Sequence, residues 1–551
     1  MEGEVRGLHE TAYLLGFFAL LSTFLALFRD RLLASSFGAG GLLDTYYAAF
    51  RIPDIVFVSI ASLVSVFILV PLLTQADKDS DRHQMIGNVL AGFSIAMLLT
   101  TVALWILMPQ ILSAFFPTLV AQGDTLLLLS RILLLQPIFL GVSGILASVT
   151  QVRGRYLLYA LAPLLYNMGI IFGIAFFYPI FGLQGIAYGV VIGAFFHMAI
   201  QVPFIRRSAY LKRASFKINA QELWKIVSIS IPRTISIAAN QVALLSLVIM
   251  SATLGAGAVS IFSLAFNLQA APLSIIGASY SVAAFPTLSR FFALGKKDYF
   301  NTQIINASRH IIFWSLPLMS LVIVLRAHIV RVTLGAGAFD WADTRLTAAA
   351  LALFIVSLTA QALSLLFVRG YYAAGETRKP LVVNVSTATG IVVGAYLFVR
   401  LFEHSDVWRF FIEELLRVEG IAGTEILMLP LSYAIFSVVN VLVFIVLYER
   451  DFGTLHRHIS KTLFQSFSAA IVAGFFAHQT LQISDGILDI NTFIGVFSLG
   501  LMAGVVGIIA GGVLLYILDN KEMKEVSAAL HNKFWKYAPI FSGGSERSTD
   551  R

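Results

Sequence analysis

The segment Val152-Arg153-Gly154-Arg155-Tyr156, followed by Pro163-Leu164-Leu165-Tyr166-Asn167, recurs 216 to 217 residues later as Val368-Arg369-Gly370-Tyr371-Tyr372, followed by Pro380-Leu381-Val382-Val383-Asn384. A second pair has nearly the same offset: Phe37-Gly38-Ala39-Gly40 with Ala49-Phe50-Arg51, and Leu254-Gly255-Ala256-Gly257 with Ala265-Phe266-Asn267. Pro71 and Pro286 follow the two copies. Because both copies lie in very apolar sequence, the repeat predicts a transporter with two homologous lobes around a central cavity.

The composition indicates a membrane protein. Of the 551 residues, 58% are hydrophobic and only 12% are charged, whereas soluble globular proteins carry roughly 25% charged residues. A helix needs about 20 mostly apolar residues to cross the hydrocarbon core. Such segments predict an all-α polytopic protein with about fourteen transmembrane helices, near 11–28, 45–73, 88–116, 124–150, 158–178, 183–204, 224–253, 258–290, 305–334, 344–373, 379–402, 426–448, 462–483 and 492–518. The segment 305–334 is the one in which a re-entrant turn is also considered.

The positive charges predict the orientation. All twelve lysines lie in segments that share one side of the membrane, and loops rich in lysine and arginine remain in the cytoplasm. The acidic segment 403–425 is expected to be an outward loop. We therefore predict a multi-pass protein of the cell inner (plasma) membrane with both termini cytoplasmic. The net charge of +8 fits attraction to membrane lipids, and it forms no compact basic domain that could bind nucleic acid.

The repeat offset divides the chain into a first lobe at 1–217 with helices 1 to 6, and a second lobe at 218–450 with helices 7 to 12. Two further helices at 451–520 could form a groove for a lipid tail, or could provide extra packing or a dimer surface; a monomer is compatible with the sequence. The tail at 521–551 is expected to begin as a cytoplasmic amphipathic helix and to end disordered. Its apolar positions are Leu518, Met523, Val526, Leu530 and Phe534.

Charged residues inside the predicted spans are rare, and each costs about 2.5 to 3.5 kcal/mol at the centre of a helix. They are Arg29, Asp30, Arg31, Asp44, Arg51, Arg131 and Arg233. Most of them belong to one hairpin, in which Gly38 and Gly40 permit backbone geometries that interrupt a helix. A cluster of guanidinium groups beside a broken helix could bind an anion such as a pyrophosphate, because arginine offers a planar fork of donors.

A structural role competes with anion binding at each of these positions. Arg29 could pair with Asp30 or Asp44 as a clamp, and Arg31 could extend its charge to the interface. Arg233 could face the cavity from the second lobe, and it could equally extend from a helix end. Asp30, Asp44, Gly38 and Gly40 are therefore expected to be structural or gating partners of the candidate site.

Catalytic patterns do not emerge from the sequence, so we expect no enzyme activity, cofactor or metal site. There are no cysteines, and the histidines lack the spacing of metal ligands. The glycine-rich segments do not continue into the Lys-Ser/Thr of a phosphate loop. Predicted helices 7 to 12 also lack an acidic residue in mid-membrane, which weakens the case for a proton or cation antiporter.

The first hairpin resembles that of the MurJ (MviN) family of lipid II flippases. The similarity is carried by Leu27-Phe28-Arg29-Asp30, Phe37-Gly38-Ala39-Gly40 and Asp44-Thr45-Tyr46-Tyr47-Ala48-Ala49-Phe50-Arg51-Ile52-Pro53, and continues through Ala162-Pro163-Leu164-Leu165-Tyr166-Asn167, Phe285-Pro286-Thr287-Leu288-Ser289 and Gly370-Tyr371-Tyr372-Ala373-Ala374-Gly375. The resemblance implies the fold of the multidrug/oligosaccharidyl-lipid/polysaccharide exporter superfamily. It also implies transfer of an undecaprenyl-pyrophosphate-linked peptidoglycan precursor from the inner to the outer leaflet.

The chain departs from the family pattern at three cationic sites, of which the second is a pair of adjacent residues. Where the family usually has arginines, this chain has Thr23, then Phe57 and Val58, and in helix 8 Asn267. The expected substrate-binding set is therefore Arg29, Arg51, Arg233 and Asn267. The alternatives are a multidrug or cation antiporter or a lipid-linked polysaccharide flippase of the same superfamily, and a membrane scaffold that no longer transports.

Overall fold

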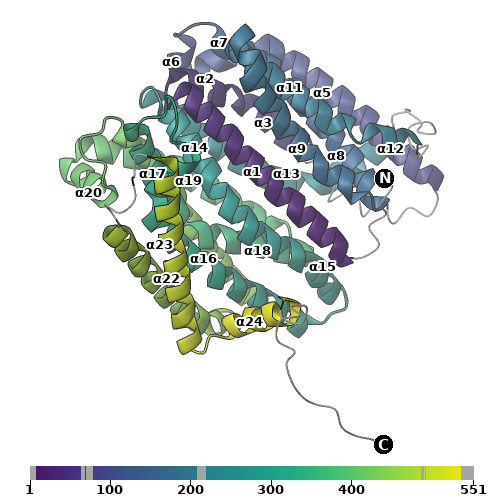
Figure 1. The fold of residues 1–551 in the computed structure, drawn as a ribbon. Coiled ribbons are helices and arrows are strands. Elements are labelled where there is room, and N and C mark those ends of the chain that lie inside the picture. Colours follow the sequence, from purple (N-terminus) through teal and green to yellow (C-terminus); the bar gives the residue numbers. More distant parts are fainter. Residues whose placement is uncertain are drawn as a thin grey trace, which may run out of the picture.

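The protein is described by a computed structural model that covers residues 8–61, 63, 69, 73, 79–207, 219–484, 489 and 492–534. Throughout these residues the regular structure is helical. Pro71 and the chain end expected to be disordered lie outside the described residues. Figure 1 shows long helices side by side in one bundle, with α24 at one end and α20 at the opposite end.

The first part of the chain, up to residue 207, forms a compact group of helices, drawn in purple to blue in Figure 1. Several of its turns contain a glycine with positive φ, at Gly38, Gly123, Gly154 and Gly182, a geometry that glycine adopts without strain. The helices are α1 (Leu8–Phe37), α2 (Gly41–Ala49), α3 (Arg51–Val56), α5 (Asp79–Phe115), α6 (Pro117–Val120), α7 (Thr125–Leu133), α8 (Gln136–Val152), α9 (Tyr156–Phe172), α10 (Tyr178–Phe181), α11 (Leu183–Ala199) and α12 (Val202–Arg207).

The remainder of the chain forms a second group, drawn in teal to yellow. The helices α22 and α23 pack on each other and on α16. The helices are α13 (Ala220–Thr253), α14 (Ala258–Leu273), α15 (Ser279–Ala293), α16 (Lys297–Thr333), α17 (Trp341–Val356), α18 (Leu358–Ala373), α19 (Arg378–His404), α20 (Asp406–Leu416), α21 (Met428–Asp451), α22 (His456–Ser484), α23 (Phe493–Ile517) and α24 (Lys521–Phe534).

The all-helical membrane fold is confirmed. Eleven helices of the described residues are long and apolar enough to cross a membrane, or twelve if the bent pair α17 and α18 is one span. The first helix α1 and the segments from Gly41 to Ala61 are the other two predicted spans, so fourteen helices are compatible with the structure.

Several predicted boundaries need correction. The helix predicted at 45–73 starts as separate pieces, α2, α3 and the π-helical segment η1 (Phe57–Ala61). The helix predicted at 344–373 bends by 44° between α17 and α18. The re-entrant turn considered within 305–334 is wrong, because α16 is continuous over this stretch. The outward loop expected at 403–425 contains the helix α20.

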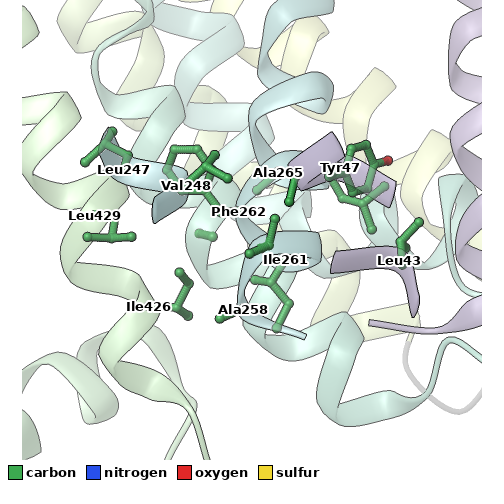
Figure 2. Close-up of a cluster of buried hydrophobic side chains, with 14 of the residues drawn as sticks. Leu43, Tyr47, Leu247, Val248, Ala258, Ile261, Phe262, Ala265, Ile426 and Leu429 are labelled. Carbon is green, nitrogen blue, oxygen red and sulfur yellow. The ribbon is translucent and has the colours of Figure 1, made fainter. Parts of the chain in front are cut away.

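The core is largest where the two groups of helices meet. Leu43 and Tyr47 of α2 lie beside Ile261 and Ala265 of α14 (Figure 2). These side chains are buried, and they lie where α2 packs against the first half of α14. Because apolar burial stabilises close packing in proportion to the area covered, this cluster fixes the position of the charged hairpin that follows α1.

Candidate transport site

The turn after α1 places the charged hairpin. Gly38 has a φ of +62°, and a Cβ atom there would lie 2.7 Å from the carbonyl oxygen of Ala338. Glycine is therefore required at this position. Gly40 has an extended backbone with a φ of −144°, and a Cβ atom there would lie 3.7 Å from its nearest neighbour. The two glycines predicted as equivalent partners of the site thus differ in their tolerance of a side chain.

Arg29 is held near the middle of the site by three donor contacts. Its Nε and one terminal nitrogen donate to Oδ1 of Asp30, at 3.0 and 2.8 Å, and the other terminal nitrogen donates to Oδ1 of Asn167 at 3.1 Å. The clamp with Asp30 that the sequence allowed is present. The alternative pairing of Arg29 with Asp44 is wrong, because Asp44 is engaged elsewhere.

Asp30 connects the first group of helices to the second. One oxygen accepts from Arg29, and the other, Oδ2, accepts from the side-chain amide of Asn267 on α14 at 3.1 Å. Asp30 is 3% exposed, so its buried carboxylate is stabilised by these hydrogen-bond partners and not by water. Asn267 thereby joins Arg29 in one hydrogen-bonded network through Asp30.

Asp44 caps the N-terminus of α14. Its Oδ2 accepts from the backbone N–H of Gly257 at 2.6 Å, and its Oδ1 accepts from the N–H and the hydroxyl of Ser260 at 2.7 and 2.6 Å. A carboxylate at the start of a helix satisfies unpaired N–H groups and lies at the positive end of the helix dipole. Asp44 therefore links the two groups of helices and is saturated with protein donors.

Arg51 also reaches across to α14. Its terminal nitrogen donates to the hydroxyl of Ser263 at 3.0 Å. In the part of the chain that the structure describes, its buried Nε has no hydrogen-bond partner, and neither has the buried hydroxyl of Tyr47. Asp54, one turn further along α3, lies close enough to attract the Arg51 charge. Arg51 thus keeps a donor that a ligand could use.

Arg233 lies apart from this network. It lies near Tyr372 and near the like-charged guanidinium of Arg369, within the second group of helices. Arg131 and Arg31 lie elsewhere. Arg131 stacks on the ring of Trp105 at 4.2 Å, and Arg31 donates to the carbonyl of Val332 and lies over the Phe493 ring.

Hydrogen bonds join the two groups of helices on either side of the network. On the α2 side, Thr118 donates to the carbonyl of Ala252 at 2.9 Å, in addition to the Asp44 cap. On the other side, Asn88 accepts from the N–H of Asn219 at 2.9 Å, and Ser230 donates to the carbonyl of Leu63 at 2.9 Å. These hydrogen bonds tie the first group of helices to the second on both sides of the network.

Sequence reasoning missed three residues of this region. Asp54 follows Arg51 by three positions, the spacing at which helical side chains meet, and this signal was available. Asn167 was found as a repeat position, and its contact with Arg29 depends on the packing of α9 against α1. Arg369 is part of the repeated Val-Arg-Gly motif, and its proximity to Arg233 follows only from the fold.

The comparisons with known proteins agree with the resemblance seen in the sequence. The family model for lipid II flippase MurJ matches residues 33–494. The chain belongs to this family. A probable lipid II flippase MurJ of Buchnera aphidicola subsp. Schizaphis graminum is 26% identical over 400 residues, which cover 71% of this chain and 78% of that protein.

Two solved structures share the fold. A lipid II flippase MurJ in an inward closed conformation superposes with a TM-score of 0.72 and 18% identity, and the match covers 92% of this chain and 100% of that chain. An inward-facing multidrug resistance transporter of the MATE family, from the MOP superfamily, gives a TM-score of 0.63 and 16% identity, with coverages of 80% and 95%. The fold that the resemblance implied is thus confirmed.

The arrangement is suited to binding and release of a polar group between two bodies of helices. Side chains of α1, α3 and α14 meet within hydrogen-bond distance across the junction. Within the described residues, histidine, aspartate and glutamate side chains do not gather in groups of three or more that could hold a metal ion.

Proposed function

We propose that this protein moves lipid II, an undecaprenyl-pyrophosphate-linked peptidoglycan precursor, from the inner to the outer leaflet. Membership of the lipid II flippase MurJ family supports this function. The observation that carries it is the Arg29–Asp30–Asn267 network, because it joins the two groups of helices through polar side chains inside an apolar bundle. Such groups are costly in a membrane and are kept for function.

Within this function, we propose that Arg51 and Arg233 supply the first hydrogen-bond donors for the pyrophosphate. Arg29 and Asn267 would then contact it from the bottom of the binding site. Arg51 has an unused Nε, and the mutual repulsion of Arg233 and Arg369 would be relieved by an anion between them. Arg29 already uses its Nε and both terminal nitrogens within the protein. When the substrate binds, the guanidinium of Arg29 would move its hydrogen bonds from Asp30 to the phosphate oxygens.

Transport would proceed by alternating movement of residues 1–217 against residues 218–450, with 451–520 providing a surface for the lipid tail and 521–551 a cytoplasmic tail. The contacts at the two ends of the site support this mechanism. Opening toward one side would break the Asp44 cap of α14, and opening toward the other would break the Asn88 to Asn219 contact. A transporter of this kind needs no catalytic group, and the family consists of flippases.

We further propose that the protein lies in the inner membrane with both termini in the cytoplasm. The many apolar spans support a multi-pass protein. The lysine distribution supports the orientation, because α24 carries Lys521 and Lys524 at the end of the bundle opposite to α20.

Complementation in cells depleted of their own lipid II flippase tests the function. The protein should restore growth, and purified protein in vesicles should move labelled lipid II between leaflets. Failure of both, with normal abundance of the protein in the membrane, would reject lipid II as the substrate. Export of organic cations driven by a proton or sodium gradient would instead establish an antiporter of the superfamily.

A further inference from the structure

The helix α20 (Asp406–Leu416) presents an apolar face that the protein leaves uncovered. The side chains of Val407, Phe410, Phe411 and Leu415 are 81%, 66%, 53% and 60% exposed. Their spacing of three and four residues places them on one side of the helix. This helix lies outside the candidate membrane spans, so the exposure of four large apolar side chains there needs an explanation.

The opposite sides of α20 are committed to the protein and to water. Ile412 and Leu416 are buried in the main core. The polar side carries Arg409 and Glu413, which pair at 2.9 Å, and Glu413 also accepts from the hydroxyl of Thr424 at 2.6 Å. The helix therefore has three distinct surfaces. On the apolar exposed one, the Phe411 ring stacks on Trp408 with 6.0 Å between ring centroids, and the four side chains stay more than half exposed.

The position of α20 is fixed at both of its ends. The side chain of Ser405 caps the N-terminus by accepting from the N–H of Trp408. At the C-terminus, Arg326 of α16 donates to the carbonyl of Leu416 at 3.5 Å, and Arg345 of α17 donates to the carbonyl of Arg417 at 3.1 Å. Cationic groups at this end also complement the helix dipole. The exposed apolar face is thus held in place and does not belong to a loosely attached segment.

The surroundings identify what covers this face. Only Ser405 separates α20 from α19, a candidate membrane span that ends at His404. The outer turns of α19 expose Leu397 and Leu401, at 57% and 45%, as a lipid-facing helix does. The chain therefore passes from a lipid-exposed span to the apolar helix α20 within two residues. Figure 1 shows α20 at the margin of the bundle, at the end opposite to α24.

We propose that α20 is an interfacial helix whose Val407, Phe410, Phe411 and Leu415 side chains insert into the membrane leaflet at this end, the outer leaflet in the proposed topology. Insertion rests on apolar area and on the tether to α19. It does not rest on charge, because the polar residues of α20 include Asp406, Glu413 and Glu414 against Arg409. Interfacial helices that depend on anionic lipid carry mostly lysine and arginine on this side. Through Arg326 and Arg345, the inserted helix fixes the ends of α16 and α17 at a constant depth.

Single cysteines in this cysteine-free chain provide the test. Phe410→Cys and Leu415→Cys report on the apolar face, Arg409→Cys on the polar side, and Leu397→Cys is the lipid-facing reference. Each purified variant, checked for a monodisperse profile, is labelled with the same environment-sensitive fluorophore and placed in phosphatidylcholine vesicles. Quenching is then measured with nitroxide-labelled phospholipid and with iodide in the buffer.

Labels at 410 and 415 should be quenched by the nitroxide lipid at least about threefold more strongly than the label at 409, and close to the label at 397. Iodide should give the reverse order. Two sites are used so that one misfolded variant does not decide the result. Strong iodide quenching at 410 and 415 would reject membrane contact. Shielding from both quenchers would also overturn the proposal, since it would indicate a second copy or another protein on this face. Lipid contact that appears only after anionic lipid is added would contradict insertion driven by apolar area.

Discussion

Arg29 shows how a residue can be placed by its neighbours before any substrate is present. An arginine fork forms strong contacts only when its plane is oriented, and here Asp30 and Asn167 orient it from two sides. Lysine could supply the charge without the three fixed donors. The geometry at this position, in addition to its charge, is therefore part of the site.

Replacement of Arg29 separates these contributions. Arg29→Lys should complement a flippase-depleted strain nearly as poorly as Arg29→Ala, with normal abundance in the membrane, because lysine cannot reproduce the bidentate contact. Arg131→Ala is the matched control, since Arg131 stacks on Trp105 away from the network, and it should complement. If Arg29 only clamps Asp30, then Arg29→Ala should lower abundance and Arg29→Ala with Asp30→Ala should restore both abundance and growth.

The two glycines of the hairpin give a second test at the scale of single residues. Gly38→Ala places a Cβ atom 2.7 Å from a backbone carbonyl at a φ of +62°, and should cost about 1 to 3 kcal/mol. Gly40→Ala meets neither strain nor a close contact, and should be nearly neutral. Thermal unfolding in detergent, followed by loss of monodisperse protein, measures the difference. Equal midpoints for the two variants would contradict the described hairpin.

At the scale of elements, α24 is fastened to the bundle by polar contacts at its start. Glu522 is 2% exposed and pairs with Arg309 of α16 at 2.5 Å. Asn520, just before the helix, donates to Gln465 of α22 at 2.8 Å. Met523 and Val526 pack beside Phe313 and Leu515. A helix is present where the amphipathic helix was predicted, and Met523 and Val526 pack against the protein; its place on the inner leaflet stays a prediction.

Glu522→Gln should loosen this attachment. Removing one partner of a buried ion pair leaves the other charge uncompensated, so the amides of α24 should exchange hydrogen faster by roughly tenfold, for a loss of about 1.4 kcal/mol. Glu525→Gln is the control, because its contact with His310 at 3.1 Å is half-exposed and exposed pairs contribute little. Unchanged exchange in Glu522→Gln would show that apolar packing alone holds α24.

The elements also show what sequence could and could not predict. Hydropathy predicted the spans, because a helix inside lipid must be apolar over its whole length. It missed α20, because the acidic residues between 403 and 425 lower the mean hydropathy of the segment. The apolar residues there nevertheless recur every three or four positions, as on one face of a helix. Hydropathy could not predict the π-helical segments η1 and η4 (Ser274–Ala278), because a π-helix has the same hydropathy as an α-helix. The two segments start 217 residues apart in the sequence. The hydrogen bond between Asp30 and Asn267 could not be predicted either, because it depends on how two helices far apart in the sequence pack together.

For the whole molecule, the orientation in the membrane remains a prediction with a direct test. Arg409→Cys and Lys521→Cys lie at opposite ends of the bundle, and the native side chains are 50% and 62% exposed. In intact cells, a membrane-impermeant maleimide should label position 409, whereas position 521 should react only after the cells are permeabilised, because basic segments remain inside. Labelling of both positions in intact cells would overturn the topology.

The two-lobe organisation also remains a prediction, and matched contacts support it. Asn167 donates to Ser22 of α1 at 3.4 Å, and Asn384, its counterpart in the repeat, donates to Ser236 of α13 at 2.8 Å. In each half, an asparagine thus bonds to the first long helix of that half. An experimental structure in which one half, rotated onto the other, fails to superpose these two pairs would reject the repeat.

The cap of α14 carries a consequence for the ancestry of the chain. Asp44 and Ser260 are separated by the repeat offset of 216 residues, yet they bond to each other. If the halves descend from one duplicated unit, this position lay on the axis of an ancestral homodimer and faced its own copy. Aspartate on both subunits would have placed two buried like charges in contact. Two such carboxyl groups share a site only when one of them is protonated. Fusion let the two copies mutate separately, and in this chain a single carboxylate meets a serine hydroxyl at the junction.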